Sequence, residues 1–215
     1  MSQSTHPVMR SGVLLGLIAL IGTALLTGVN ALTHERIKQQ ERNRMMQQFN
    51  AIVPSASFNN DLLTDRIEVR EEKLFRHPQP VSVYRARMDG RPVAALMTIT
   101  APDGYNGDIR ILVGIDDKGV VLGVRIIAHR ETPGLGDPIE LDKSDWVLGF
   151  TSKSLKNPQE KAWAVKRDGG AFDQFTGATI SPRAVVRAVH NCLLYFEANR
   201  QNLFDTPADI TESNG

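Results

Sequence analysis

The residues best suited to chemistry are two threonines that enclose a Gly-Ala pair, Thr176 to Thr179. A helix is predicted just after them, because Ser181 is a good N-cap and Pro182 suits the first helical position. A helix N-terminus offers unpaired backbone N–H groups and a partial positive charge, and both favour phosphate. The segment therefore suits a phosphate group, or a phosphoester to the Thr179 hydroxyl. A loop of small residues before a helix is, however, more often only a connection.

Composition narrows the other kinds of chemistry. Cys192 is the one cysteine of the chain, which excludes an intramolecular disulfide and a protein-ligated iron–sulfur cluster. The five histidines are scattered without metal-ligand spacing, so no metal site is predicted. The formal net charge is +1 and no Lys/Arg run is interleaved with aromatics, so no nucleic-acid partner is predicted. Electron transfer would therefore require an organic cofactor.

Three acidic residues lie close together after the middle of the chain, but their pattern does not indicate a catalytic pair. Glu131, Asp137 and Glu140 lie in and just after a loop that contains one proline and two glycines before Asp137. Such carboxylates are more typical of turns and caps than of acid–base catalysis. We therefore predict no catalytic residue.

The elements that must position the Thr176–Thr179 loop form an α+β domain. Alternating residues from Pro80 to Ala101, centred on Asp89-Gly90, predict one β-hairpin. Two β-rich runs from Gly107 to Arg130 predict a second, so the heart of the domain is an antiparallel sheet of hairpins with packed helices. A short helix over Leu141–Phe150, with Trp146 turned into the core, and a short strand over Trp163–Val165 are also expected.

The last helix presents an apolar face, and Cys192 belongs to it. The residues of this face are Val185, Val189, Cys192, Leu193 and Phe196. Their helical spacing indicates that the Cys192 thiol is buried and behaves as a small apolar group rather than a nucleophile.

The N-terminal region predicts one transmembrane helix. Gly12 to Leu32 is an uncharged run of 21 residues, close to the length that crosses a bilayer. A cleaved signal peptide, with Val29-Asn30-Ala31 as its cleavage site, is the alternative. His34 to Pro54 is typical of a helical stalk that Pro54 ends. The expected parts are a tail (1–11), an anchor (12–32), the stalk (33–54), the folded domain (55–204) and a flexible tail (205–215).

The charges beside the anchor bear on its direction in the membrane. Arg10 is the only Lys or Arg before the anchor, whereas Arg36, Lys38, Arg42 and Arg44 follow it closely. The positive-inside rule would therefore keep the C-terminal domain in the cytoplasm. That rule is weak for large translocated domains and for short N-terminal tails.

Longer motifs resemble one known family. Asp173 to Thr179 matches the Asp-x-x-Ser/Thr-Gly-Ala-Thr signature of bacterial proteins that carry covalent flavin. The wider chain is similar to the G subunit of the Rnf/Rsx ion-translocating electron transport complex and to the related C subunit of the sodium-pumping NADH:quinone oxidoreductase. The resemblance is carried by TITAPDGYNG (Thr98–Gly107), HRETPGLGDPIE (His129–Glu140) and WAVKRDGGAFDQFTGATISPRAVV (Trp163–Val186).

The resemblance implies the cofactor and its residues. A flavin transferase would esterify the phosphate of FMN to Thr179. Asp173 would help the transferase or contact the phosphate end. The loop Glu131–Gly136 is implied to lie against the flavin, although its composition alone indicates a rigid connector. The implied FMN-binding residues are Asp173, Thr176, Gly177, Ala178 and Thr179 in one segment and Glu131, Thr132, Leu135 and Gly136 in the other.

The resemblance also implies a cellular context. The chain would be an electron-relaying subunit of the bacterial inner membrane, single-pass, with its soluble domain on the periplasmic side. Its partners would be the other subunits of the Rnf/Rsx complex and the flavin transferase. Two alternatives remain: a free-standing membrane-anchored flavin reductase, and a non-redox tethered assembly module in which Thr176–Thr179 is only a loop.

Overall fold

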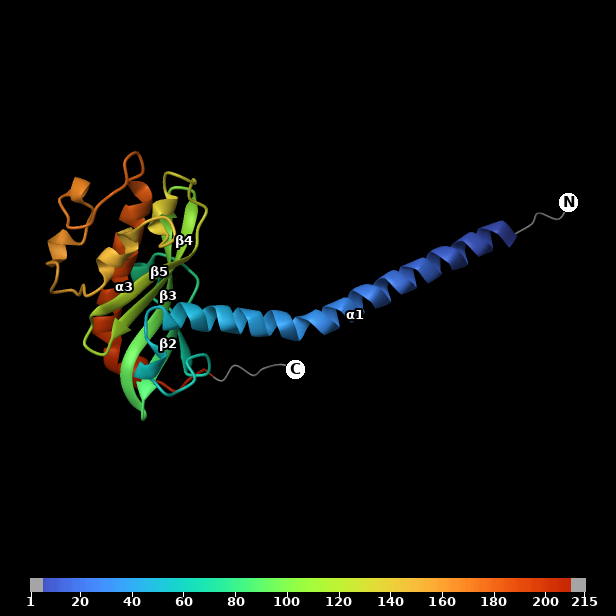
Figure 1. Ribbon diagram of the computed structural model, residues 1–215, viewed down its shortest axis with the longest axis horizontal. Coiled ribbons are helices and arrows are strands. Elements are labelled where there is room, and N and C mark those ends of the chain that lie inside the picture. The colour runs from blue at the N-terminus through green and yellow to red at the C-terminus, as the bar shows by residue number, and fades with distance from the viewer. Residues whose placement is uncertain (1–5, 210–215) are drawn as a thin grey trace. The chain divides into compact units, whose positions relative to one another are not determined.

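The computed structural model describes residues 6–209. Contacts divide the chain into a first unit that ends at Gln47 and a second that begins at Gln48. The helix α1 (His6–Asn50) makes up the described part of the first unit and continues for three residues into the second. The expected anchor and the expected stalk as far as Asn50 are thus parts of one continuous helix, drawn in blue in Figure 1; the helix ends before Pro54.

Helix α1 contains the apolar stretch that was predicted to cross a membrane. Met9–Gly28 is 20 residues long, has a mean hydropathy of 2.0, and has no part buried inside the protein. By length and composition this stretch could span a bilayer. Length and composition do not separate a retained anchor from a cleaved signal sequence, so that choice stays a prediction.

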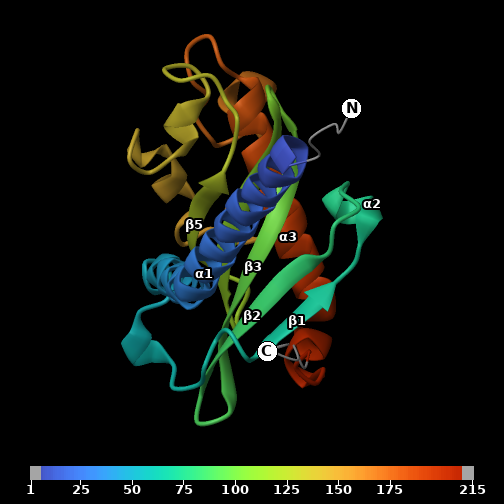
Figure 2. The same cartoon turned by 90° about the vertical axis from the view of Figure 1, so that its right-hand side faces the viewer.

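The second unit is built on one antiparallel sheet of five strands in the order β1-β2-β3-β4-β5. Both predicted hairpins are confirmed, and the sheet can be followed in Figure 2. The first turns at Asp89 and Gly90, whose φ angles of 53° and 78° are those of a type I′ turn. The strands are β1 (Arg66–Val69), β2 (Val81–Met88), β3 (Arg91–Gly104), β4 (Gly107–Asp116) and β5 (Val121–Ala128).

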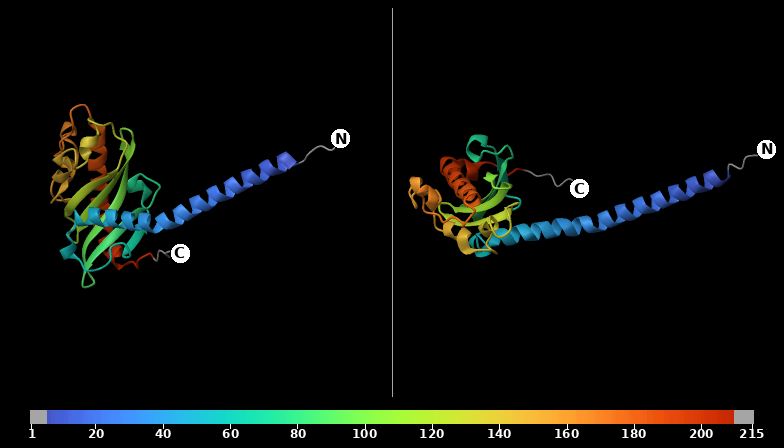
Figure 3. Two further views of the ribbon diagram at one scale, coloured as in Figure 1. Left: turned by 45° about the vertical axis from the view of Figure 1, so that its right-hand side comes forward. Right: turned by 90° about the horizontal axis from the view of Figure 1, so that it is seen from above.

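Helix α3 (Ile180–Asp205) packs along one face of this sheet, as Figure 3 shows in red. All five residues of the predicted apolar face are buried in the core that α3 shares with the strands. Cys192 is fully buried, its sulfur lies 3.5 Å from that of Met97, and burial raises the pKa of its thiol. The α+β prediction and the burial of the Cys192 thiol are therefore confirmed.

The other face of the sheet is covered by the last turn of α1 and the residues that follow it. The Phe49 ring lies 4.8 Å from that of Tyr84. Ile52 packs over Gly114 and Gly123, which face each other in β4 and β5. A Cβ added at Gly114 would lie 2.2 Å from the Ile52 side chain, so only glycine leaves room for it. The end of the expected stalk is thus part of the folded domain.

The segment between β5 and α3 contains no strand ladder, and one prediction there is wrong. Val165 makes only an isolated bridge with Phe172, so Trp163–Val165 is not a strand. Its apolar side chains instead join an aromatic cluster, in which the centroid of the Trp163 ring lies 5.1 Å from that of the tilted Phe172 ring and 6.4 Å from that of the stacked Phe150 ring. The short helix is confirmed in a shorter form, as the 3₁₀ helix η3 (Asp145–Phe150), with Trp146 packed at the edge of the core.

The remaining elements are short. The helix α2 (Glu72–Phe75) follows β1. Neither element was predicted from the sequence. After α3 the chain returns to β1, because the Asp209 N–H donates to Arg66 at 2.8 Å and its carboxylate accepts from the Glu68 N–H at 2.6 Å. The domain is therefore ordered at least to Asp209, and residues 210–215 of the expected tail lie outside the described residues. The other 3₁₀ helices are η1 (Ser55–Ser57), η2 (Asp137–Ile139), η4 (Glu160–Ala162) and η5 (Lys166–Asp168).

His190, on α3, makes the stability of the domain depend on pH. Its ring stacks on Trp163 at 5.3 Å, and its buried Nε2 has no hydrogen-bond partner within residues 6–209. Burial lowers the pKa of His190, against a smaller opposite effect of the Glu160 carboxylate. The unfolded chain therefore binds this proton more readily than the folded chain does.

We expect the free energy of unfolding to fall as the pH drops below about 6.5, and to be unaffected by this group above it. The effect is limited by the partial exposure of the ring. Urea unfolding of wild type and His190→Phe between pH 5 and 8 measures it. Parallel pH profiles of the two proteins would contradict the assignment.

Candidate functional site

The two candidate loops meet at one cavity of about 210 Å³. The sequence separates them by some forty residues, and the fold brings them together at the start of α3. The turn between β3 and β4 contributes a third wall that was not predicted. The lining residues are Tyr105 from that turn, Glu131, Thr132, Leu135 and Gly136 from the loop after β5, and Gly177, Ala178, Thr179, Ile180 and Ser181 from the start of α3.

The loop before α3 turns tightly so that Thr179 stands at the helix N-terminus. The Ala178 N–H donates to the Phe175 carbonyl at 3.1 Å, and Gly177 takes a φ of +81°, which favours glycine. Thr179 is the N-cap residue, and its carbonyl accepts from the Arg183 N–H at 3.1 Å. Its hydroxyl is therefore placed both at the cavity wall and at the positive end of α3.

The prediction that Ser181 is the N-cap is wrong. Helix α3 begins at Ile180, so Ser181 is the second helical residue and Pro182 the third. The Ser181 hydroxyl does not bond to its own helix; it donates to the Glu131 carboxylate. The local pattern predicted that the Ser181 hydroxyl caps the helix, but it forms a tertiary hydrogen bond with Glu131 instead.

Glu131 joins the three walls of the cavity. Its side chain is buried, with only 4% of its surface exposed. It accepts from the backbone N–H groups of Tyr105 at 3.3 Å and Asn106 at 3.0 Å, and from the Ser181 hydroxyl. One carboxylate thus holds the β3–β4 turn, its own loop and the first turn of α3 together.

The loop Glu131–Gly136 is compact. The Leu135 and Gly136 N–H groups donate to the Thr132 carbonyl at 3.1 and 3.0 Å, and the Thr132 hydroxyl accepts from Asn106 Nδ2 at 3.1 Å. A Cβ at Gly136 would lie 2.8 Å from the Ser181 hydroxyl and 2.9 Å from the Glu131 carboxylate. Gly136 therefore lets the loop approach α3 closely enough for the Glu131–Ser181 hydrogen bond.

The rim of the cavity is apolar and open to solvent. Tyr105 is 66% exposed, Leu135 48% and Ile180 42%. A cavity with apolar walls and a few polar groups at one end is typical of a site for a planar cofactor with a polar tail.

The charged groups beside Thr179 come mainly from η5 and its neighbours. Arg167 Nη1 donates to the Thr179 hydroxyl at 3.3 Å. Arg183 forms a two-pronged hydrogen bond with Asp168, through Nε at 2.6 Å and Nη2 at 2.9 Å. This contact lowers the pKa of the Asp168 carboxyl and raises the pKa of Arg183. It links η5 to the first turn of α3.

Not every predicted residue lines the cavity. Asp173 is exposed, forms an ion pair with Lys166 at 2.6 Å, and accepts from Trp146 Nε1 through its backbone carbonyl at 2.8 Å. Thr176 is exposed at the outside of the turn. Both belong to the segment that surrounds Thr179, but neither faces the cavity.

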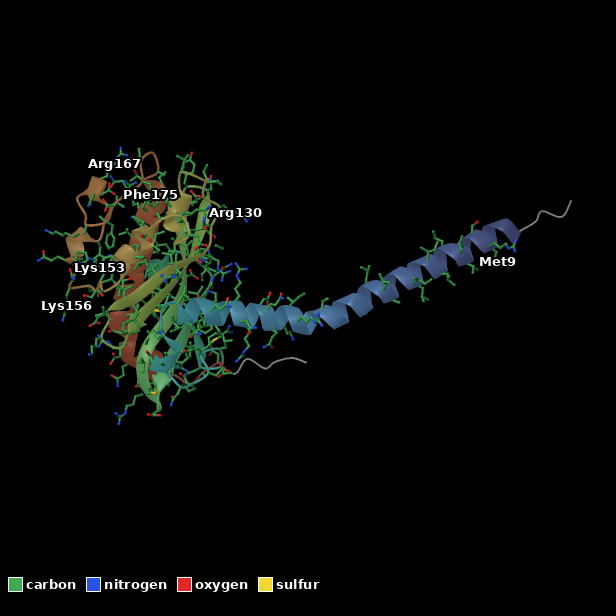
Figure 4. All side chains as sticks on the ribbon, in the orientation of Figure 1. Met9, Arg130, Lys153, Lys156, Arg167 and Phe175 are labelled. Atoms are coloured by element: carbon green, nitrogen blue, oxygen red, sulfur yellow. The ribbon has the colours of Figure 1, made fainter. Side chains whose placement is uncertain are left out.

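Three residues of the site were not singled out from the sequence: Tyr105, Arg167 and Ile180. Tyr105 and Arg167 lie inside the quoted motifs, but nothing in their spacing relates them to Thr179. Arg167 and Phe175 lie at the end of the domain where α3 begins (Figure 4). Within the described part of the chain, no group of three His, Cys, Asp or Glu residues could hold a metal ion.

The chain is similar to known proteins over nearly its whole length. The model of the FMN-binding domain matches residues 104–194, which include every residue that lines the cavity, and the model of the RnfG N-terminal region matches residues 1–52. A Shewanella loihica protein, named as the G subunit of an ion-translocating oxidoreductase complex, is 50% identical over 202 residues, or 94% of this chain and 95% of the relative. Proteins with the same name from Pseudomonas aeruginosa (47% over 196 residues, 91% and 92%) and Vibrio cholerae (44% over 200 residues, 93% and 95%) are similar as well.

Proposed function

This chain belongs to the family of G subunits of ion-translocating oxidoreductase complexes and contains the FMN-binding domain of that family, and we propose that the FMN is joined to Thr179 through a phosphoester. The observation that supports the linkage most directly is the place of the Thr179 hydroxyl. It lies at the wall of the cavity, at the N-terminus of α3 and within hydrogen-bonding distance of a guanidinium.

The residues of the cavity fit FMN. The flavin ring is flat and largely apolar, and the exposed side chains of Tyr105, Leu135 and Ile180 offer it apolar contact. The phosphate is an anion, and the N-terminus of α3 and Arg167 both favour negative charge. A Cβ at Gly177 would meet only the Leu135 side chain, at 3.9 Å, so this glycine keeps the loop free of bulk where a ring would approach the backbone.

The protein's own groups bind and orient the cofactor, and FMN when bound supplies the electron transfer. Glu131 fixes the spacing of the three walls through its hydrogen bonds. Thr132 and Leu135 line the same cavity as the Thr179 segment. The buried Glu131 carboxylate is fully engaged in these contacts, which supports a positioning role rather than acid–base catalysis.

Formation of the phosphoester is a transfer without oxidation or reduction. The Thr179 oxygen would bond to phosphorus, its proton would pass to a base of the flavin transferase, and the bond from phosphorus to the leaving group of an activated FMN donor would break. We assign Gly177 and Ala178 to the shape of the acceptor loop. Asp173 and Thr176 are exposed beside it, which suits contact with the transferase.

The test of the linkage is the intact mass of the full chain after coexpression with a flavin transferase. We expect an increase equal to one FMN less one water. An unmodified and colourless protein, made beside a demonstrably active transferase, would contradict the proposal and favour a tethered assembly module.

We also propose that the domain faces the periplasm, anchored in the inner membrane by α1 beside the other subunits of the complex. The apolar stretch Met9–Gly28 and the family membership support a membrane position. The basic residues after the stretch argue against this direction, but that bias is weak for a large translocated domain.

A reporter fused after Gly215 measures the side of the membrane directly. We expect an alkaline phosphatase fusion to be active and a β-galactosidase fusion to be inactive, because only the former folds actively outside the cytoplasm. The reverse pattern would place the domain in the cytoplasm and overturn this assignment.

A further inference from the structure

Arg167 is the charged side chain in direct contact with the acceptor oxygen. Its Nη1 donates to the Thr179 hydroxyl at 3.3 Å, and the residue is exposed at the outside of η5. A guanidinium offers five N–H donors in a planar fork, of which this hydrogen bond uses one. The others remain available to an anion attached to the same oxygen.

The backbone around Arg167 is held on both sides. Its N–H donates to the Gln174 side chain at 3.1 Å. The next residue, Asp168, makes the two-pronged contact with Arg183 on α3, and Gly169 closes the turn with a φ of +83°. The position of Arg167 relative to Thr179 is therefore set by the same helix whose N-terminus holds Thr179.

The neighbouring basic groups are already engaged with carboxylates. Lys166 pairs with Asp173 at 2.6 Å, and Arg183 pairs with Asp168. The backbone of the first turn of α3 is also a limited source of donors, since Pro182 at its third position has no N–H. Of the three basic side chains beside the loop, Arg167 is the one whose charge is directed at Thr179.

We propose that Arg167 is the positioning residue of the phosphoester. Its guanidinium orients the Thr179 oxygen for transfer and afterwards binds the phosphate through the donors that the hydroxyl leaves free. This inference rests on the proposed linkage at Thr179. It adds a specific role for a residue that lies outside the Thr176–Thr179 loop and outside the cavity lining.

The experiment compares full-length wild type, Arg167→Gln and Arg167→Lys, with Arg91→Gln as the matched control. Arg91 is an exposed arginine of the β2–β3 hairpin, where β2 pairs with β3. The initial rate of FMN transfer under limiting transferase and the ³¹P resonance of the loaded protein are measured. The resonance reports the surroundings of the phosphate whatever the redox activity.

We expect Arg167→Gln to slow transfer about tenfold, which corresponds to about 1.4 kcal/mol, and to shift the ³¹P resonance. Arg167→Lys keeps the charge but not the fork, so it should recover part of the rate. Arg91→Gln should match wild type in both measurements. An Arg167→Gln protein with wild-type rate and resonance would overturn the role of Arg167 and leave the linkage standing. A wild type that stays unmodified would overturn both.

Discussion

Thr179→Ala is expected to carry no covalent flavin, whereas wild type made beside the same transferase carries one FMN. The reason is local: the alanine lacks the oxygen that would bond to phosphorus, and the other lining residues of the cavity offer no substitute in the same place. The Thr179 side chain is partly exposed at the N-cap and makes no cap hydrogen bond, so its removal should leave the fold intact. Flavin fluorescence in a denaturing gel and intact mass both measure the result.

Thr179→Ser is the matched control for that loss. Serine keeps the oxygen at the same distance from the backbone and removes only a methyl group. We expect it to retain covalent flavin, at a lower yield, because its side chain is freer to rotate. Denatured Thr179→Ala protein that still fluoresces would place the bond on another residue, with Thr176 as the nearest hydroxyl in the loop.

Glu131→Ala is expected to destabilise the domain by about 1–3 kcal/mol. The substitution removes the acceptor of three hydrogen bonds, from the N–H groups of Tyr105 and Asn106 and from the Ser181 hydroxyl. The Ser181 hydroxyl is buried, and a buried donor that loses its partner costs about 1–3 kcal/mol, whereas the two N–H groups belong to exposed residues and can bond to solvent instead. Urea unfolding of the full chain, followed by tryptophan fluorescence, measures the change.

Glu131→Gln separates the shape of this side chain from its charge. The amide fills the same volume and keeps one acceptor, so we expect it to cost less than half as much as alanine. FMN transfer to Glu131→Ala should also fall, because the β3–β4 turn and the start of α3 lose their common partner. If both variants unfold at the wild-type urea concentration, the Glu131 carboxylate does not hold the walls of the cavity together.

Local patterns predicted the parts of this fold that depend on neighbouring residues. The two hairpins followed from alternation around Asp89-Gly90 and around the second turn, and the structure confirms both. The buried face of α3 followed from the helical spacing of its apolar residues. In each case the local sequence pattern and the tertiary contacts favour the same element.

The wrong predictions concern segments whose local structure depends on residues distant in the sequence. Ser181 has the local features of an N-cap, but a carboxylate fifty residues earlier takes its hydroxyl. Trp163 and Val165 suit a strand, yet the aromatic rings of Phe150 and Phe172 hold this segment without a ladder. The short strand β1 was missed because it has only four residues, and its pairing with β2 is not visible in its own pattern.

The site itself was predicted in pieces. The resemblance to flavin-carrying proteins indicated both loops, and the cavity that joins them agrees with that indication. The individual assignments of Asp173, Thr176 and the loop Glu131–Gly136 to FMN remain proposals. Arg167 and Tyr105 could not be related to Thr179 from spacing, because only the path of the chain through η5 and the β3–β4 turn brings them near it.

Pro182 at the third position of α3 has a consequence for how long the cofactor stays. A helix terminus without this N–H, beside an open rim, would let a reversibly bound nucleotide escape and exchange with the surrounding medium. The phosphoester proposed at Thr179 would make the dissociation rate of the cofactor irrelevant. Under that proposal the bond retains the cofactor, and the cavity can stay shallow and accessible to a redox partner.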